Sequence, residues 1–299
     1  MPYLESELIL TDNERIYHLD LAPGEVAKKI ILVGDQERVP KVSKFFDTIE
    51  VKRSKREFVT HTGTYQGERI TCISTGIGTD NIDIVLNELD ALFNIDFKTR
   101  EDKIEKTKLQ FVRIGTCGTL QSDIDPGSII ASEYVIGFDG LLNFYEGKKD
   151  VYPELLEAFK KQTKWDASFN RPYICETSDE MLAKIGFDAI HGITCTANGF
   201  YAPQGRLLRV KNKVGDLNSK LSAFNFEEKR ITNFEMETSG LYGMSEILGH
   251  EALTMCLVLA NRVNRTFLED YATKKLEATK IKDFLCGHWY VTRFWTRMS

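Results

Sequence analysis

Two glycine-containing turns, each with an arginine, are suited to holding an anion. In VGDQER (Val33–Arg38) the turn glycine and the arginine directly follow an apolar run, and in RIGTCG (Arg113–Gly118) the arginine lies inside one. Backbone N–H groups and a guanidinium in such a turn can converge on a phosphate-like ion. Because a buried charge needs a partner, Arg113 predicts either a bound anion or an internal salt bridge. For Arg38 the alternative is a surface arginine in an ordinary turn.

Two further segments have side chains suited to a sugar and a heterocycle. In NFEMET (Asn233–Thr238), Glu235 and Glu237 stand two residues apart, and a carboxylate accepts hydrogen bonds from vicinal sugar hydroxyls. The alternative is the acid-rich first turn of a helix. FYAPQGR (Phe200–Arg206) offers an aromatic ring, an amide and a guanidinium, which together can stack on a heterocycle and hydrogen-bond to it. A plain surface loop is the alternative there.

The composition and the missing motifs exclude several other classes of protein. GxxxxGK[ST] and GxGxxG are absent, so the turns are neither a P-loop nor a dinucleotide fingerprint. The six cysteines form no CxxC or CxxxC pair and predict buried free thiols. The net charge of −5 gives no basic field for nucleic acid or an anionic membrane, and no apolar stretch approaches the ~20 residues of a membrane span. We therefore expect a cytoplasmic protein without nucleic-acid or membrane partners.

The elements that must position these residues begin with a set of apolar strands. Runs typical of buried strands recur along the chain, at 29–33, 70–74, 109–114, 128–131 and 252–260. Several of these runs end in glycine turns, which is typical of the ligand-facing edge of an α/β sheet.

Helical periodicity fills the intervals between the strands. It predicts helices over 81–97, 239–248 and 272–284, while the charged connection 98–108 is interpreted as a solvated helix end or loop. The chain has no internal repeat and no Pro/Gly/Ser linker, so the pattern favours one α/β domain over two.

Seven short segments occur together in one order. Between about Tyr17 and Arg262 the chain carries LVGDQERV, SKREF, STGIG, RIGTCG, FYAPQGR, NFEMET and LANR. Together they resemble the nucleoside phosphorylase-I family and, through the FYxxQxR segment, its uridine phosphorylases. The resemblance implies one domain over residues 1–299, with a central mixed β-sheet flanked by helices. It also implies a pentosyltransferase of pyrimidine salvage that reversibly converts uridine and phosphate into uracil and ribose 1-phosphate, with inorganic phosphate as co-substrate and no cofactor. Some relatives bind a monovalent cation near the position of Glu57, but the neighbouring segment TDNID differs from theirs, so we expect no metal site.

The same resemblance assigns roles to individual residues. The positions that match phosphate-binding residues of the family are Gly34, Arg38, Arg56, Arg113 and Thr116. Those that match ribose contacts are His18, Met236 and Glu237, and those that match base contacts are Phe200, Gln204 and Arg206. The set expected to act in catalysis is Arg113, Gln204, Arg206 and Glu237. Arg56 and His18 match residues that enter the site from a neighbouring subunit, so we expect a homodimer or an assembly of dimers with shared sites.

The chain departs from the family pattern at two informative places. Gln36 replaces a proline that is usual in the first turn. The segment after the late strand reads Leu259-Ala260-Asn261-Arg262, where the purine branch has a Ser-Asp pair, so the purine-type general acid is missing. The alternatives that stay open are a phosphorylase of other pyrimidine or purine nucleosides, a nucleosidase that uses water, and a catalytically silent nucleoside-binding protein.

Overall fold

One long mixed β-sheet forms the centre of the structure, a computed structural model that describes residues 2–147, 151–186 and 189–268. The strands are β1 (Lys29–Val33), β2 (Thr48–Lys55), β3 (Phe58–Tyr65), β4 (Glu68–Ser74), β5 (Ile95–Asp96), β6 (Glu101–Asp102), β7 (Gln110–Thr119), β8 (Ile129–Gly137), β9 (Tyr173–Glu176), β10 (Ile190–Thr196), β11 (Asn225–Phe226), β12 (Lys229–Glu235), β13 (Glu251–Asn261) and β14 (Thr266–Phe267). The main path of the sheet runs β11-β12-β10-β8-β13-β7-β1-β4-β3-β2, with β9 beside β8 and β14 beside β13. β7 pairs in parallel with β1 and β13, and its last residues also meet β12.

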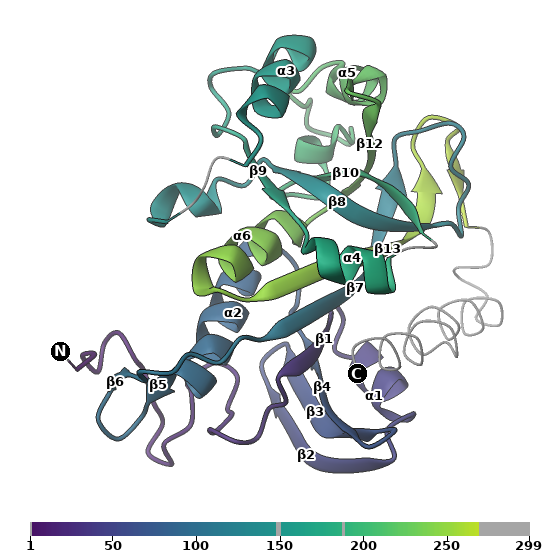
Figure 1. Cartoon of the computed structure of the whole chain (residues 1–299). Coiled ribbons are helices and arrows are strands. Elements are labelled where there is room, and N and C mark those ends of the chain that lie inside the picture. The colour runs from purple at the N-terminus through teal and green to yellow at the C-terminus, as the bar shows by residue number, and fades with distance from the viewer. Residues whose placement is uncertain (1, 148–150, 187–188, 269–299) are drawn as a thin grey trace.

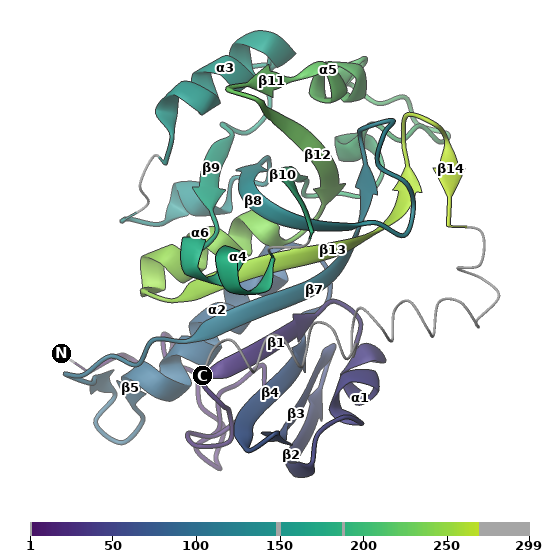
Figure 2. The ribbon, with the colours of Figure 1, turned by 45° about the vertical axis from the view of Figure 1, so that its right-hand side comes forward.

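Helices cover both faces of this sheet. They are α1 (Arg38–Ser43), α2 (Thr79–Asn94), α3 (Pro153–Thr163), α4 (Asp179–Ile185), α5 (Leu217–Ala223) and α6 (Thr238–Leu248), with short 3-10 turns at Leu141–Phe144 and Ala202–Gln204. Figures 1 and 2 show α2 and α6 side by side, α3 and α5 together at one end of the molecule, and α1 with β2 to β4 at the other.

The apolar strand runs arise because the central strands are buried on both sides. In β1, Ile30 and Leu32 belong to the core that α2 and α6 cover, whereas Ile31 and Val33 belong to the core that α1 and α4 cover. Successive side chains of a strand point to opposite faces, so a strand between two helical layers is apolar at every position. This confirms the prediction of an α/β fold with a mixed sheet.

The predicted elements match the observed ones with local differences. β1 has the predicted bounds, and the other predicted strand runs lie within or overlap β4, β7, β8 and β13. α2 begins and ends earlier than the predicted 81–97, because Gly78 already caps its start and Ile95 has an extended backbone. The connection 98–108 is irregular apart from the two-residue strand β6. The predicted helix 272–284 lies outside the described residues.

The structure also describes the cysteines and the lengths of the helices. The five cysteines within the described ranges are buried and form no disulfide with one another, as predicted, and Cys286 lies outside those ranges. In the part of the chain that the structure describes, none of the helices has the length and apolar character needed to span a bilayer.

Candidate active site

The turns that follow several strands meet at one pocket of about 630 Å³. β1, β4, β7 and β12 all reach it with their carboxyl ends, the edge at which α/β sheets collect ligands. All sequence-predicted site residues except His18 and Arg56 line this pocket, namely Gly34, Arg38, Arg113, Thr116, Phe200, Gln204, Arg206, Met236 and Glu237. The folded chain therefore brings together segments that are up to about two hundred residues apart in sequence.

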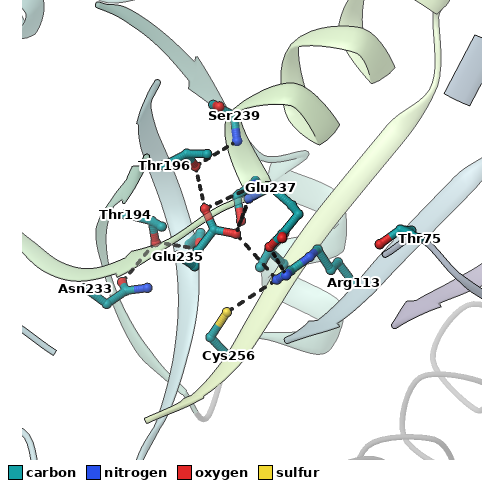
Figure 3. A network of polar contacts seen from close by, with 12 residues as sticks. Thr75, Arg113, Thr194, Thr196, Asn233, Glu235, Glu237, Ser239 and Cys256 are labelled. Atoms are coloured by element: carbon teal, nitrogen blue, oxygen red, sulfur yellow. Dashed lines mark hydrogen bonds and ion pairs between the residues drawn. The ribbon is translucent and has the colours of Figure 1, made fainter. Parts of the chain in front are cut away.

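Arg113 forms the polar centre of the site (Figure 3). Its buried guanidinium donates through Nη2 to the carboxylate of Glu237, and Nη1 lies 3.5 Å from Oε2 of Glu235. Nη1 also contacts Sγ of Cys256 at 3.7 Å. Of the two possibilities left open for Arg113, the internal salt bridge is therefore present. Burial alone would lower the pKa of Arg113, but the charges of Glu237 and Glu235 outweigh burial and raise it.

The R-x-G spacing of β7 has a steric cause. Residues 113 and 115 share one face of the strand, and the Arg113 side chain folds across Gly115. A Cβ at Gly115 would lie 2.0 Å from Nη1 of Arg113 and 3.1 Å from Sγ of Cys256. Only glycine leaves room for the arginine in this position.

The two glutamates of NFEMET have different hydrogen-bond partners. Glu235 accepts the backbone N–H groups of Glu237 and Thr238 at 2.9 Å and the hydroxyl of Thr196, so it caps the start of α6. Both glutamates precede α6, whose first turn holds no acidic residue, so the alternative interpretation of the motif as an acid-rich first turn is wrong. Glu237 instead lines the pocket, with Oε1 accepting the N–H of Gly78 at 2.9 Å. Burial raises the pKa of Glu237, Arg113 opposes this rise, and Glu235 adds to it.

A second group of polar side chains is built on the FYAPQGR loop. The Arg206 guanidinium stacks on the Phe200 ring, 3.6 Å from the ring centre, and donates to Oε1 of Gln204 at 2.6 Å. Because the amide oxygen of Gln204 accepts from Arg206, its NH₂ group is the donor left for a ligand. Burial and the nearby Arg262 lower the pKa of Arg206 to about 10, so the side chain stays cationic at neutral pH.

Hydrogen bonds from neighbouring segments anchor this loop. The backbone oxygen of buried Gln204 accepts from Arg262 at 3.0 Å and from Asn218 at 3.1 Å. Gly205 has a φ of 71°, and a Cβ there would lie 2.6 Å from Nδ2 of Asn218, so glycine is required on two grounds. The contact of Arg262 was not assigned from sequence, although LANR places this arginine directly after the late strand.

Arg38 remains available for a ligand. It begins α1 after the turn at Gly34 and is half-buried. Within residues 2–147, 151–186 and 189–268 its guanidinium has no hydrogen-bond or ion-pair partner. The adjacent turns are joined, because the N–H of Gly76 donates to the oxygen of Gly34 at 3.0 Å. Nε of Arg113 is a second N–H group that is buried and lacks a partner in the same ranges.

Arg56 and His18 lie together outside this pocket. Arg56 occupies the turn between β2 and β3 with a φ of 54° and is exposed. Its guanidinium lies 6.0 Å from the ring centre of Tyr17, and the rings of Tyr17 and His18 are 4.9 Å apart. Glu57, the next residue after Arg56, lines the pocket, so this surface borders the site. The chain alone does not bring His18 or Arg56 into its own pocket.

Asn261 has a structural task instead of a place in the pocket. Its Nδ2 donates to the backbone oxygens of Gln121 and Ile124, both at 2.9 Å. Its Oδ1 accepts the N–H groups of Val263 and Asn264 at 3.0 and 2.8 Å. The amide is thus fully engaged by backbone groups. The described residues also contain no cluster of His, Cys, Asp and Glu side chains suited to a metal ion.

Several known proteins are similar to this chain. The curated relatives include uridine phosphorylases from Thermococcus kodakarensis, 31% identical over 271 residues (89% of this chain and 84% of the relative), and from Haemophilus influenzae, 27% identical over 265 residues (88% and 92%). A solved nucleoside phosphorylase of Trypanosoma brucei, described as showing uridine phosphorylase activity, has a TM-score of 0.82, 29% identity and coverage of 96% of this chain and 100% of its own. A uridine phosphorylase of the oomycete Phytophthora capsici shares the fold, with a TM-score of 0.67, 22% identity and coverage of 100% and 99%.

The family itself follows from a match over most of the sequence. The model of the phosphorylase superfamily matches residues 28–287, which include every strand and helix described above. The matched residues include the two arginine-containing glycine turns, the NFEMET segment and the FYAPQGR loop, which the fold brings to one pocket. The family match and the geometry of the pocket therefore concern the same residues. The chain belongs to the phosphorylase superfamily.

Proposed function

We propose that the protein is a uridine phosphorylase, which cleaves uridine with inorganic phosphate to give uracil and ribose 1-phosphate. The observation that carries this proposal is the set of side chains that share the pocket described above. It holds an arginine that has no partner among the described residues (Arg38), a buried carboxylate (Glu237) and a linked amide and guanidinium (Gln204 and Arg206). These groups suit, in turn, a phosphate, vicinal hydroxyls and a uracil ring. The names of the relatives support the same assignment.

The phosphate subsite is assigned to Gly34, Arg38 and Thr116, with Arg56 supplied by a second copy. Unlike Arg38, Arg113 has its positive charge already balanced by the carboxylates of Glu235 and Glu237. Its main task is to fix Glu237, while the unpartnered Nε can be satisfied by a ligand oxygen. The positive charge that attracts the phosphate dianion therefore comes chiefly from Arg38 and the second copy's Arg56.

The ribose and the base occupy the rest of the pocket. Glu237 accepts hydrogen bonds from the 2′- and 3′-hydroxyls beside Met236, and its orientation is set by Gly78 and Arg113. Gln204 and Arg206 bind the polar edge of uracil beside the Phe200 ring.

The reaction needs no side-chain nucleophile. A phosphate oxygen forms a bond to C1′ of the ribose while the C1′–N1 bond breaks, and the electron pair of that bond leaves on uracil as its anion. The proton that hydrogen phosphate gives up on becoming the monoester restores neutral uracil through the solvent. Arg206 and Gln204 donate to the uracil oxygens on which the negative charge spreads, and such preorganised donors are worth ~3–4 kcal/mol each. Aligning the two substrates in one pocket supplies a further ~7–11 kcal/mol. Inorganic phosphate is the co-substrate, and the reaction requires no cofactor.

The pocket favours pyrimidine nucleosides over purine nucleosides as substrates. Asn261 cannot replace the missing purine-type acid, because its amide is engaged by four backbone groups outside the pocket.

The proposal is tested by following uracil release from uridine at increasing phosphate concentrations. We expect release to depend on phosphate, inosine to react far more slowly, and Arg38→Ala to raise the KM for phosphate with a smaller effect on uridine. Equal release without phosphate indicates a nucleosidase, comparable rates on inosine contradict the base assignment, and binding of uridine without turnover indicates a silent binding protein.

A further inference from the structure

Glu88 organises the segment that carries His18. It lies on α2, with its side chain 12% exposed. Its carboxylate accepts the backbone N–H of His18 at 3.0 Å and that of Leu19 at 2.9 Å. Oε1 also lies 2.6 Å from Nδ1 of the His18 ring. One side chain therefore fixes both the backbone and the imidazole of His18.

The surrounding turn is closed and anchored, so His18 is presented from a defined position. The N–H of Ile16 donates to the oxygen of Leu21 at 2.8 Å, and the N–H of Asp20 donates back to Ile16 at 3.1 Å. Leu19 and Leu21 are fully buried in the core. Arg15 donates to the oxygen of Asp20 at 2.7 and 2.9 Å.

The contact with Glu88 decides which ring nitrogen His18 offers. An ionised carboxylate only accepts hydrogen bonds, and the same carboxylate already accepts two backbone N–H groups, so Nδ1 is the donor of the ring. In the neutral imidazole Nε2 is then the free acceptor, as in other histidines whose tautomer is fixed by a carboxylate. Within the described part of the chain Nε2 has no hydrogen-bond partner.

We propose that Glu88 is a positioning residue. It orients Nε2 of His18 to accept a hydrogen bond from the 5′-hydroxyl of a nucleoside in the pocket of a second copy. This inference rests on the proposed function and on the shared-site assignment of His18. Glu88 does not touch the substrate, and its effect passes entirely through the orientation and tautomer of the imidazole.

The position of Glu88 gives α2 a part in two pockets. The N–H of Gly78, at the start of this helix, donates to Glu237 in the chain's own pocket. Glu88 lies ten residues further along, about 15 Å at the rise of an α-helix, and holds the histidine intended for the second copy. α2 thus orients the Glu237 carboxylate in the chain's own pocket through Gly78, and the His18 imidazole for the second copy's pocket through Glu88.

A pair of substrates separates this role from a merely structural one. Uridine and 5′-deoxyuridine differ only in the 5′-hydroxyl, so the ratio of their kcat/KM values measures the contact of His18. In Glu88→Gln the amide NH₂ can face Nδ1 and reverse the tautomer. We expect kcat/KM for uridine to fall about tenfold, the value of one hydrogen bond, and kcat/KM for 5′-deoxyuridine to stay unchanged.

Three further variants complete the experiment. His18→Ala should lower the same ratio, and the double variant His18→Ala/Glu88→Gln should lower it no further. Asp83→Asn is the matched control, because it makes the same carboxylate-to-amide change on α2 at a residue that binds Tyr145 and Asn87 instead. It should leave the ratio at the wild-type value.

The outcomes distinguish the inference from the proposed function. If the wild type releases no uracil in the presence of phosphate, the proposed function itself fails. If the wild type is active but Glu88→Gln lowers both substrates equally or leaves the ratio unchanged, the positioning role is overturned. A wild type that does not prefer uridine to 5′-deoxyuridine overturns the role of His18 and, with it, that of Glu88.

Discussion

At the scale of single residues, the ion pair between Arg113 and Glu237 ties the anion side of the pocket to the sugar side. Arg206 stands apart from this pair, since its partners are Phe200 and Gln204. We expect Arg206→Ala to lower kcat/KM for uridine by on the order of a hundredfold and to leave phosphate affinity nearly unchanged. Arg113→Met should weaken the binding of both substrates, because it leaves the buried carboxylate of Glu237 without its cation.

Steady-state kinetics with each substrate varied in turn, together with thermal unfolding, check this contrast. Removing one partner of a buried ion pair costs ~3–5 kcal/mol, so Arg113→Met should also unfold at a lower temperature than Arg206→Ala. If Arg206→Ala weakened phosphate binding as strongly as Arg113→Met does, the two arginines would not serve different parts of one pocket.

The raised pKa of Glu237 predicts how uridine affinity depends on pH. A raised pKa means that the carboxylate takes up its proton at a higher pH than an ordinary glutamate, which titrates near ~4.3. Protonation removes the charge that faces Arg113 and one acceptor for the ribose hydroxyls. Uridine affinity, measured by calorimetry without phosphate, should therefore decline on acidification before the usual glutamate range is reached. Glu237→Gln should bind weakly at every pH, and a wild-type affinity that stays constant through pH 4 would argue against this role.

At the scale of elements, β7 positions Arg113 through the glycine two residues further along. Gly115→Ala should push the guanidinium away from Glu237, because the added Cβ would overlap Nη1. We expect a loss of activity of at least tenfold, comparable to the loss of one buried hydrogen bond to a charged group. Activity of Gly115→Ala at the wild-type level would show that the R-x-G spacing has another cause.

Most of the strands and helices could be predicted from the sequence, because they follow from patterns of neighbouring residues. The continuous apolar run of β1 predicts a strand buried on both faces, and the glycine turns after β1, β4 and β7 predict a ligand-facing edge. The predicted end of α2 was wrong by three residues, because apolar residues continue into the extended segment at Ile95. The resemblance to a family supplied which of the arginines and glutamates belong to one site.

The contacts that set the geometry could not be predicted, because they join residues far apart in sequence. The charge of Arg113 requires a partner, but nothing local indicates that Glu237 is that partner rather than an anion. The N–H of Gly78 on Glu237 and the carboxylate of Glu88 on His18 depend on how α2 packs on the sheet.

At the scale of the whole molecule, one chain presents a pocket and, on a bordering surface, two side chains that its own pocket does not use. His18 and Arg56 flank Tyr17 there, next to Glu57 at the pocket edge. In a two-fold dimer each copy can give these residues to the other, so every interface would carry two pockets. We therefore expect the smallest active unit to be a homodimer, which a solution mass measurement checks.

Mixing two inactive variants tests the sharing of sites. The Arg56→Ala chain has an intact pocket but supplies no arginine to its partner's pocket. The Arg206→Ala chain has a defective pocket but supplies an intact Arg56 to its partner. A hybrid dimer then has one complete site, so random exchange should restore about a quarter of the wild-type activity. If mass spectrometry shows hybrid dimers and activity stays at the level of the separate variants, Arg56 does not act across the interface.

The central claim is that phosphate, and not water, receives the ribosyl group. Phosphorus-31 NMR of the protein with uridine and inorganic phosphate measures this directly, because ribose 1-phosphate and inorganic phosphate give separate signals. We expect the ribose 1-phosphate signal to grow in step with the uracil released, and to be absent when Arg206→Ala replaces the wild type over the same time. Uracil release accompanied by free ribose and an unchanged phosphate signal would contradict the assignment as a phosphorylase.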